Sequence, residues 1–121
     1  LKGAELILCP TAIGGLECEG PALAAQQLAA WLNVQQAHAV ANGCYYAAVN
    51  RTGREGETSF WGSSFCCDFY GEFIAKGSDR EPEIVTARCD FAALEEHRRM
   101  WPFFRDRRID AYSHISRRFD A

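Results

Sequence analysis

The sequence predicts an α/β protein whose helices pack in layers against a mixed β-sheet. Three observations support this fold class: short runs of β-branched and aromatic residues, one long segment rich in alanine and glutamine, and a shorter helix-like segment near the end. Their order is strand, long helix, several strands, helix and tail. Strands this apolar need cover on both faces, and two helices cannot provide it. We therefore expect a further layer from outside these residues.

The first third of the chain predicts a strand, a loop and the principal helix. Residues 6–9 form a short apolar run that Pro10-Thr11 should end, and the glycine-rich stretch that follows has no period. The helix is expected over residues 21–43. Pro21 suits a first helical turn and Gly43 is a good terminator, while the alanines and glutamines between them favour the helical state.

The remainder predicts more strands and a second helix. Residues 44–50 are β-branched and aromatic, and a polar, glycine-bearing connection follows them. Two strands hinged at Tyr70-Gly71 are expected next, and then another strand over residues 81–90. Asp90 is a suitable N-cap for the helix after it, and Pro102 should stop that helix. The tail beyond is rich in arginine and aromatic residues.

Length, composition and charge narrow the functional classes. The chain has 121 residues, which is enough for one domain or for part of a larger one. Its 48% hydrophobic and 24% charged residues are ordinary for a globular protein. The formal net charge of −3 argues against nucleic acid as a partner, and no apolar stretch reaches transmembrane length. We therefore expect neither nucleic acid nor a membrane as partner.

Six cysteines raise the question of disulfides or a metal site. Their spacing contains no C-x-x-C pair, and the histidines are not grouped near them. Cys66 and Cys67 are neighbours in a predicted strand, where successive side chains point to opposite faces. We expect reduced thiols in a cytoplasmic protein, with no metal and no cofactor.

The residues by themselves do not assemble a complete catalytic centre. A nucleophile needs a base and a group that orients the base, and no histidine is linked in sequence to a particular cysteine. The stretch WGSSF lacks the second glycine of a nucleophile elbow, and no glycine-rich phosphate loop is present. We therefore predict no catalytic residue in this chain.

Four stretches together indicate a family: LKGAELILCPTAIG, AWLNVQQAHAVANGCYYAAVNRTG, FWGSSFCCDFYGEFIA and WPFFRDRRIDAY. In this order they resemble the carboxyl-terminal half of the nitrilase superfamily of carbon–nitrogen hydrolases, over nearly the whole chain. PTAIG and FRDRR are most similar to the N-carbamoylputrescine amidase branch. The resemblance implies a portion of a four-layer α-β-β-α sandwich, in which two sheets pack face to face between helices. A second sheet would be the missing layer.

The resemblance also implies a chemistry, the hydrolysis of a carbon–nitrogen bond that is not a peptide bond. Family members use a Glu general base, a Lys that stabilises the tetrahedral intermediate, and a Cys that forms a thioester. All three lie upstream of the matching segment, so we expect Leu1 to lie in mid-domain and this chain alone to be inactive.

The implied substrate is N-carbamoylputrescine, in polyamine biosynthesis. The alternatives are a β-ureidopropionase-like or ω-amidase-like member of the superfamily, and a non-catalytic module that a partner chain completes.

Three groups of residues carry implied roles. The edge of the substrate pocket, or else a plain strand end, comprises Pro10, Thr11, Ala12 and Ile13. Structural hydrogen bonds near the site are expected from Asn42, Asn50 and Arg51. A subunit interface of a homo-oligomer, or else an internal core with a solvated basic tail, comprises Trp31, Trp101, Phe103, Phe104, Arg105, Arg107 and Arg108.

Overall fold

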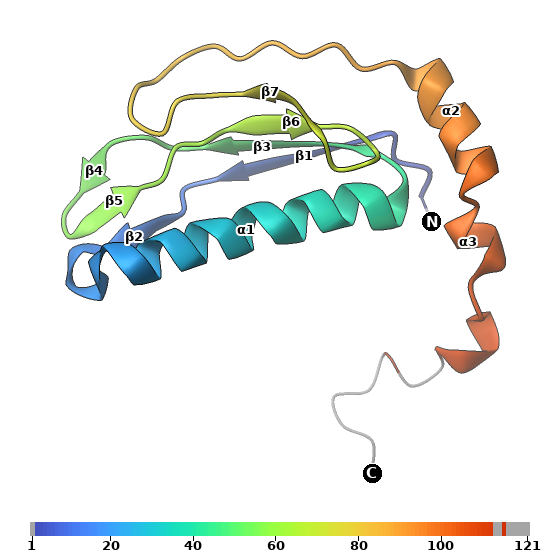
Figure 1. Ribbon diagram of the computed structural model, residues 1–121, viewed down its shortest axis with the longest axis horizontal. Helices are drawn as coiled ribbons and strands as arrows, with labels where there is room; N and C mark the ends of the chain where they lie inside the picture. Colours follow the sequence, from blue (N-terminus) through green and yellow to red (C-terminus); the bar gives the residue numbers. More distant parts are fainter. Residues whose placement is uncertain (1, 113–114, 116–121) are drawn as a thin grey trace.

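The computed structural model describes residues 2–112 and residue 115, and it confirms an α/β arrangement with a mixed sheet (Figure 1). The elements in chain order are β1 (Leu6–Thr11), β2 (Gly14–Leu16), α1 (Gly20–Asn42), β3 (Tyr45–Asn50), β4 (Arg54–Glu55), β5 (Thr58–Phe60), β6 (Phe65–Cys67), β7 (Phe73–Lys76), α2 (Phe91–Met100) and α3 (Phe103–Asp106), with single 3-10 turns at Glu17–Glu19 and Ile109–Ala111.

The main sheet has four strands in the order β1-β3-β6-β7. Strands β1 and β3 are parallel, with Leu6 opposite Tyr45 and Thr11 opposite Asn50. Helix α1 makes the crossover connection that a parallel pair requires. Strands β6 and β7 extend the sheet in antiparallel fashion. Since β1 and β3 are parallel, their carboxyl ends lie side by side at one edge of the sheet.

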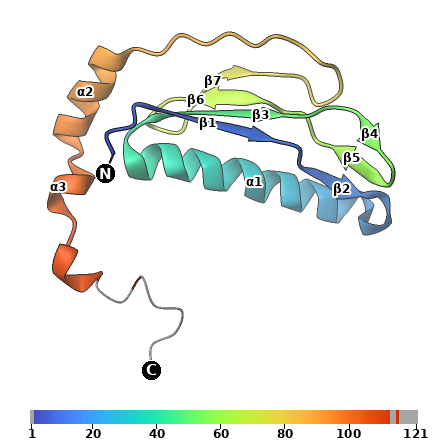
Figure 2. The same ribbon diagram turned by 180° about the vertical axis from the view of Figure 1, so that it is seen from behind.

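Helix α1 matches its prediction to within one residue at each end. Pro21 lies in the first turn, and Gly43 closes the helix in the left-handed conformation, at φ 51° and ψ 62°. Glycine adopts this conformation without a steric penalty, and its N–H donates to the Ala39 and Val40 carbonyls. Figures 1 and 2 show α1 along one face of the four-stranded sheet. In the described part of the chain, neither α1 nor any other helix is long and apolar enough to cross a membrane.

Alternate side chains of β3 divide the core into two clusters, because neighbouring strand residues point to opposite faces. On the α1 side, Tyr46 belongs to a cluster with Ala39, Ala48, Phe65 and Cys67. On the other face, which we call the outer face, Tyr45 packs with Phe69 and Leu94. Helix α2 thus reaches the outer face through Leu94.

The prediction of a strand over residues 81–90 is wrong, since the structure has no strand there. Residues 77–90, which we call the outer segment, run along the outer face of the sheet on the side away from α1 (Figures 1 and 2). Val85 and Ala87 line a hollow there together with Ala47 of β3. Because the segment lies over the sheet and not beside β7, its backbone has no strand edge with which to pair.

Strands β2 and β4 lie in stretches expected to be loops, and with β5 they form a second, antiparallel sheet in the order β2-β5-β4. The first of the two strands expected around Tyr70-Gly71 is therefore wrong as one strand: it is divided into β5 and β6, which belong to different sheets. Gly14 allows the pairing of β2 with β5, because a Cβ atom there would overlap the Ser59 carbonyl. Strand β1 also continues to Thr11, past its predicted end. Pro10 is tolerated there because β1 is the outermost strand of its sheet in the described chain.

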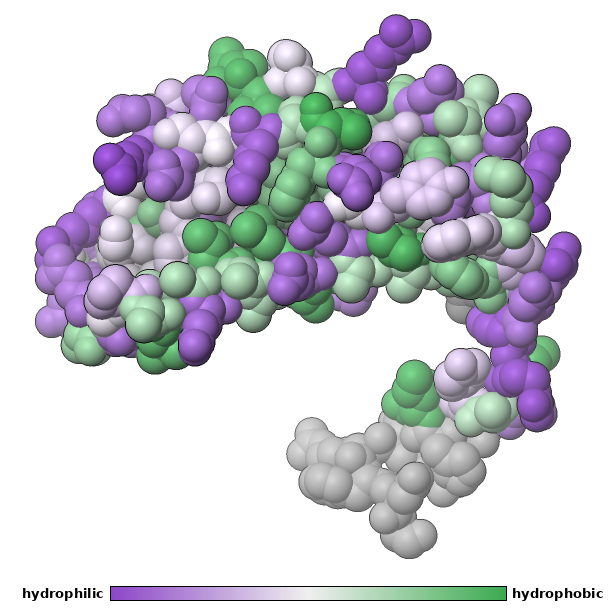
Figure 3. All heavy atoms as spheres, in the orientation of Figure 1, coloured by the Kyte–Doolittle hydropathy of each residue, from purple (hydrophilic) through white to green (hydrophobic). Residues whose placement is uncertain are grey.

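The second helix begins where it was expected. The Asp90 carboxylate accepts hydrogen bonds from the Ala92 and Ala93 N–H groups, each at 3.0 Å. Helix α2 ends at Met100, and Pro102 directly precedes the short α3, so the predicted stop is confirmed. In Figures 1 and 3 the described residues after α3, 107–112, lie apart from the sheet and from α1.

Candidate functional site

The candidate site lies where the parallel strands β1 and β3 end. In open α/β sheets, ligands bind outside the carboxyl ends of the strands. The structure places the predicted pocket edge, residues 10–13, at this point and sets Thr11 opposite Asn50. Two groups of predicted residues, far apart in sequence, are therefore brought together here.

Asn50 joins three segments of chain through its side-chain amide. Its Oδ1 accepts from the Ile13 N–H at 2.9 Å and from the Thr11 hydroxyl at 3.0 Å. Its Nδ2 donates to the carbonyls of Ile13 at 3.0 Å and Gly62 at 3.1 Å. An amide offers two donors and two acceptor lone pairs, so this 7% exposed side chain is fully satisfied. Asn50 therefore fixes the loop at Thr11 and Ile13, and its side chain has no hydrogen-bonding group left for a ligand.

Both the backbone and the side chain of Arg51 interact with other residues of the chain. Its N–H donates to the Thr11 carbonyl at 3.2 Å. Its guanidinium pairs with Glu55 and lies 4.4 Å from the centre of the Phe60 ring. A cation held by a carboxylate and an aromatic face is poorly available to bind a substrate carboxylate.

A cavity of about 290 Å³ adjoins this edge. It lies between the end of β3 and the outer segment. Apolar groups make up most of its lining, and the polar residues that also line it are Asn50, Arg51, Thr52, Ser64, Ser78, Glu81 and Glu83. Glu83 accepts a hydrogen bond from the Ser78 N–H, so its carboxylate is partly engaged. The lining therefore has an acidic side contributed by the outer segment.

Sequence reasoning missed Ser64, Glu81 and Glu83. Ser64 lies within a stretch considered only as the opening of a strand, yet its hydroxyl accepts from the Asn50 N–H at 3.0 Å. The two glutamates belong to the segment wrongly predicted as a strand. Local sequence patterns contain no signal for either placement, since both depend on how distant segments meet.

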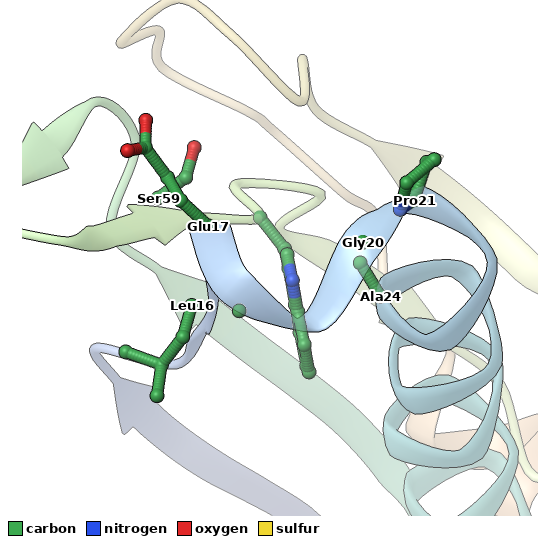
Figure 4. Close-up of a pocket in the computed structure, with 8 residues that line it drawn as sticks. Leu16, Glu17, Gly20, Pro21, Ala24 and Ser59 are labelled. Atoms are coloured by element: carbon green, nitrogen blue, oxygen red, sulfur yellow. The ribbon is translucent and has the colours of Figure 1, made fainter.

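A second hollow, of about 270 Å³, follows directly after the pocket edge (Figure 4). The close-up shows Leu16 and Glu17 on one side and Gly20, Pro21 and Ala24 of α1 on the other, with Ser59 of β5 beside them. Its lining is largely apolar side chain and glycine, which suits an aliphatic group rather than a charged one.

The turn between β2 and α1 is held by Glu19. Its carboxylate accepts from the Leu16 N–H at 2.8 Å and from the Gln27 amide at 3.0 Å. These two hydrogen bonds, the Leu16 one foremost, lower the pKa of Glu19 below its ordinary value. The shape of the second hollow thus depends on an ionised carboxylate next to it.

Asn42 lies far from this edge. It is the last residue of α1, and its Nδ2 donates to the His38 carbonyl one turn earlier, at 2.9 Å. Strand β3 begins three residues later, so Asn42 lies near the amino end of the strand whose carboxyl end forms the site. The structure therefore places Asn42 apart from Asn50 and Arg51.

The buried thiols have the properties of packing groups. Burial raises the pKa of Cys66 to about 12 and that of Cys67 to about 11. Burial also raises the pKa of Cys44. A thiol that stays protonated at neutral pH is a poor nucleophile. No group of three or more metal-binding side chains that could hold an ion occurs among the described residues.

The predicted interface residues fall into two sets. Trp31 packs inside the chain, with its ring 6.0 Å from Phe65 and 6.4 Å from Trp61. The others lie on and just after α2 and α3, where their side chains are exposed or half-buried. Arg105 pairs with Asp106, so part of the basic charge there is neutralised locally.

A parallel strand pair with a fixed loop and a cavity at its carboxyl edge is the place where open α/β proteins bind their ligands. The chain belongs to the carbon–nitrogen hydrolase family, since residues 1–99 match the family model "Carbon-nitrogen hydrolase". The prediction of a portion of this fold is confirmed by a crystal structure of a carbon–nitrogen hydrolase from Helicobacter pylori G27. That structure is 46% identical, with a TM-score of 0.94 over 98% of this chain and 43% of its own.

Curated relatives agree with the family and differ in their substrates. A citrullinase from Francisella tularensis is 39% identical over 98% of this chain and 42% of its own length. An N-carbamoylputrescine amidase from Arabidopsis thaliana is 35% identical over 93% of this chain and 39% of its own length. The chain therefore spans about two fifths of the relatives that it matches.

Proposed function

We propose that residues 1–121 form the carboxyl-terminal part of a single carbon–nitrogen hydrolase domain that acts on N-carbamoylputrescine in the cytoplasm. The reaction would transfer the carbamoyl carbon to a cysteine thiol as a thioester, which water then resolves. The products would be putrescine, ammonia and carbon dioxide, as in polyamine biosynthesis. The Glu, Lys and Cys of the mechanism would not come from this chain, and alone it would release no ammonia.

The negative charge that lines the cavity beside Asn50 is the observation that supports N-carbamoylputrescine as the substrate. Glu81 and Glu83 line it, whereas the guanidinium of Arg51 is paired with Glu55. A substrate that ends in an ammonium group is attracted by such a lining, and one that ends in a carboxylate is repelled. N-carbamoylputrescine ends in an ammonium group. This supports it over N-carbamoyl-β-amino acids and ω-amides, which are the alternatives within the superfamily.

A second candidate is a non-catalytic module completed by a partner chain. The outer face favours it, because Leu8 and Val49 are 67% and 60% exposed there. Apolar strand residues this exposed are commonly covered by another surface. A partner that covers the outer face would leave this chain a role in binding only.

We also place a homo-oligomer contact on the segment after α2. Trp101, Phe103 and Phe104 are exposed or half-exposed there, and Phe103 borders an apolar hollow with Ala37 and Val40 of α1. Aromatic residues are favoured in subunit interfaces. Trp31 is left out of this contact because it packs within the chain.

The first measurement is the intact mass of the purified protein together with ammonia release. A protein of these 121 residues alone should release no ammonia from N-carbamoylputrescine. A longer polypeptide should release ammonia from N-carbamoylputrescine faster than from N-carbamoyl-β-alanine or citrulline. Ammonia from the shorter protein, or a preference for a substrate ending in a carboxylate, would contradict the proposal.

A substitution at Glu81 tests whether the charge of the cavity contributes to substrate binding. In an active protein, Glu81→Gln should raise the KM for N-carbamoylputrescine about tenfold and leave kcat unchanged. Glu95→Gln, on the exposed side of α2, is the matched control and should change neither constant. An unchanged KM for Glu81→Gln would remove the support for an ammonium-ended substrate.

A further inference from the structure

Two thiols from different segments meet on the outer face of the sheet. Cys66 lies in β6 and is 6% exposed, while Cys89 lies in the outer segment and is partly exposed. Both thiols line the same hollow of about 190 Å³ on the outer face. Cys67 is excluded from this contact, because its side chain belongs to the cluster on the α1 side.

The outer segment is tied to the sheet only near its ends. At its start, the Gly77 N–H donates to the Ser64 carbonyl at 2.7 Å. At its end, the Tyr45 hydroxyl donates to the Asp90 carbonyl at 3.1 Å and accepts from the Asp90 N–H at 2.8 Å. Within the described chain, no backbone group of residues 79–89 hydrogen-bonds to the backbone of the sheet. Side-chain contacts alone hold the middle of this segment.

We propose that Cys66 and Cys89 form a reversible disulfide that fastens the outer segment to β6. This inference is independent of the proposed substrate. The oxidant would be a low-molecular-weight disulfide. The Cys89 thiolate attacks it, forms a mixed disulfide and releases one small thiol. Cys66 then loses its proton to solvent and attacks the Cys89 sulfur, which releases the second small thiol. Two protein thiols are oxidised by two electrons, and one small disulfide is reduced to two thiols.

The order of the two steps follows from exposure and acidity. Cys89 is the thiol that solvent reaches, so the first attack occurs there. Burial, together with the neighbouring Cys89 thiol, raises the pKa of Cys66, so little thiolate is present for the second attack. Oxidation should therefore be slow and should pass through a mixed disulfide that can be trapped.

The test is oxidation of the purified protein with glutathione disulfide, followed by mass spectrometry without reduction. We expect the protein to lose the mass of two hydrogen atoms and to yield a peptide that links residues 66 and 89. Tryptic cleavage after Arg88 in the outer segment should slow by about tenfold, because opening of that segment is restricted. Dithiothreitol should reverse both changes.

Single variants identify the pair. Cys89→Ser should abolish the link, whereas Cys67→Ser and the exposed Cys18→Ser should retain it. The wild-type peptide map and Cys89→Ser suffice if Cys66→Ser does not fold. A Cys66–Cys67 link, a stable glutathione adduct on Cys89, or a protein that keeps all its thiols would each overturn the proposal.

Discussion

The two faces of the four-stranded sheet are built in different ways. On the α1 side, Phe65 is only 3% exposed, and Trp31 meets its ring edge-on. On the outer face, Leu8 and Val49 are largely exposed, and the cover is a segment without strand pairing. One long helix therefore completes a core on its side, while the outer face depends on a few ties and leaves apolar residues uncovered. Substitutions on the two faces should differ accordingly.

The largest effect is expected from Phe65→Ala. The substitution leaves a cavity under α1 and should lower the free energy of unfolding by about 4 kcal/mol. Urea denaturation followed by far-UV circular dichroism measures it. Val49→Ala on the outer face is the control and should cost less than about 0.5 kcal/mol. A similar loss from both variants would mean that the outer face is covered as fully as the α1 face.

Asn50→Ala should be the next most damaging change. It leaves the part-buried N–H and carbonyl of Ile13 and the buried carbonyl of Gly62 without this partner, and it should cost about 3 kcal/mol. Asn42→Ala removes one hydrogen bond within α1 and serves as the control, with a loss below about 1 kcal/mol. Equal losses from the two asparagines would contradict the positioning role of Asn50.

Tyr45→Phe tests the tie at the end of the outer segment. It removes the hydroxyl that bonds to both backbone groups of Asp90 and should cost about 1–2 kcal/mol. Amide hydrogen exchange should quicken around Asp90 and leave α1 unchanged. Tyr70→Phe, at a half-exposed position, should have no such effect. Faster exchange along α1 as well would indicate that the two faces are not independent.

The smallest effect concerns acid pH. His97 is 1% exposed, among the rings of Phe69, Tyr70 and Trp101, and its ring nitrogens have no hydrogen-bond partner in the described chain. Desolvation lowers the pKa of His97. The positive charge of Arg98 adds to this, and the Asp68 carboxylate opposes it.

In the unfolded chain the His97 imidazole takes up a proton near pH 6.5, whereas in the folded chain it does so only at lower pH. Stability should therefore decrease as the pH falls below about 6.5, until the folded imidazole also titrates. Denaturation midpoints at several pH values check this. His97→Phe should abolish that part of the decrease, while the exposed His38→Gln should retain it. If the loss of stability at acid pH persisted in His97→Phe, other titratable groups would be its cause.

The parts of the fold that local chemistry controls could be predicted from the sequence. Pro21, Gly43 and Asp90 each act on the backbone within one turn, so the ends of α1 and the start of α2 were predictable. The course of residues 81–90 was not predictable, because Val85 and Ala87 line a hollow over a sheet face and do not pair with a neighbouring strand. Whether an apolar run pairs or only packs is decided by tertiary structure.

The candidate site shows the same limit. The resemblance brought residues 10–13 and Asn50 to notice, and the structure places them in contact. Their roles in binding remain predictions. Glu81 could not be predicted to line the cavity, because its position depends on the path of the outer segment. Asn42 matched a family position but lies near the other end of β3, a separation that sequence spacing does not show.

The hydrogen bonds of Asn50 have a consequence for the folding pathway. They join residues 37 and 12 positions away, at Ile13 and Gly62, so they can form only after β1, β3 and the turn before β6 have met. Contacts of such separation close large loops and belong to the late stages of folding. The hydrogen bonds of the Asn50 amide therefore form after the folding transition state. Their removal in Asn50→Ala should speed unfolding and leave the folding rate almost unchanged.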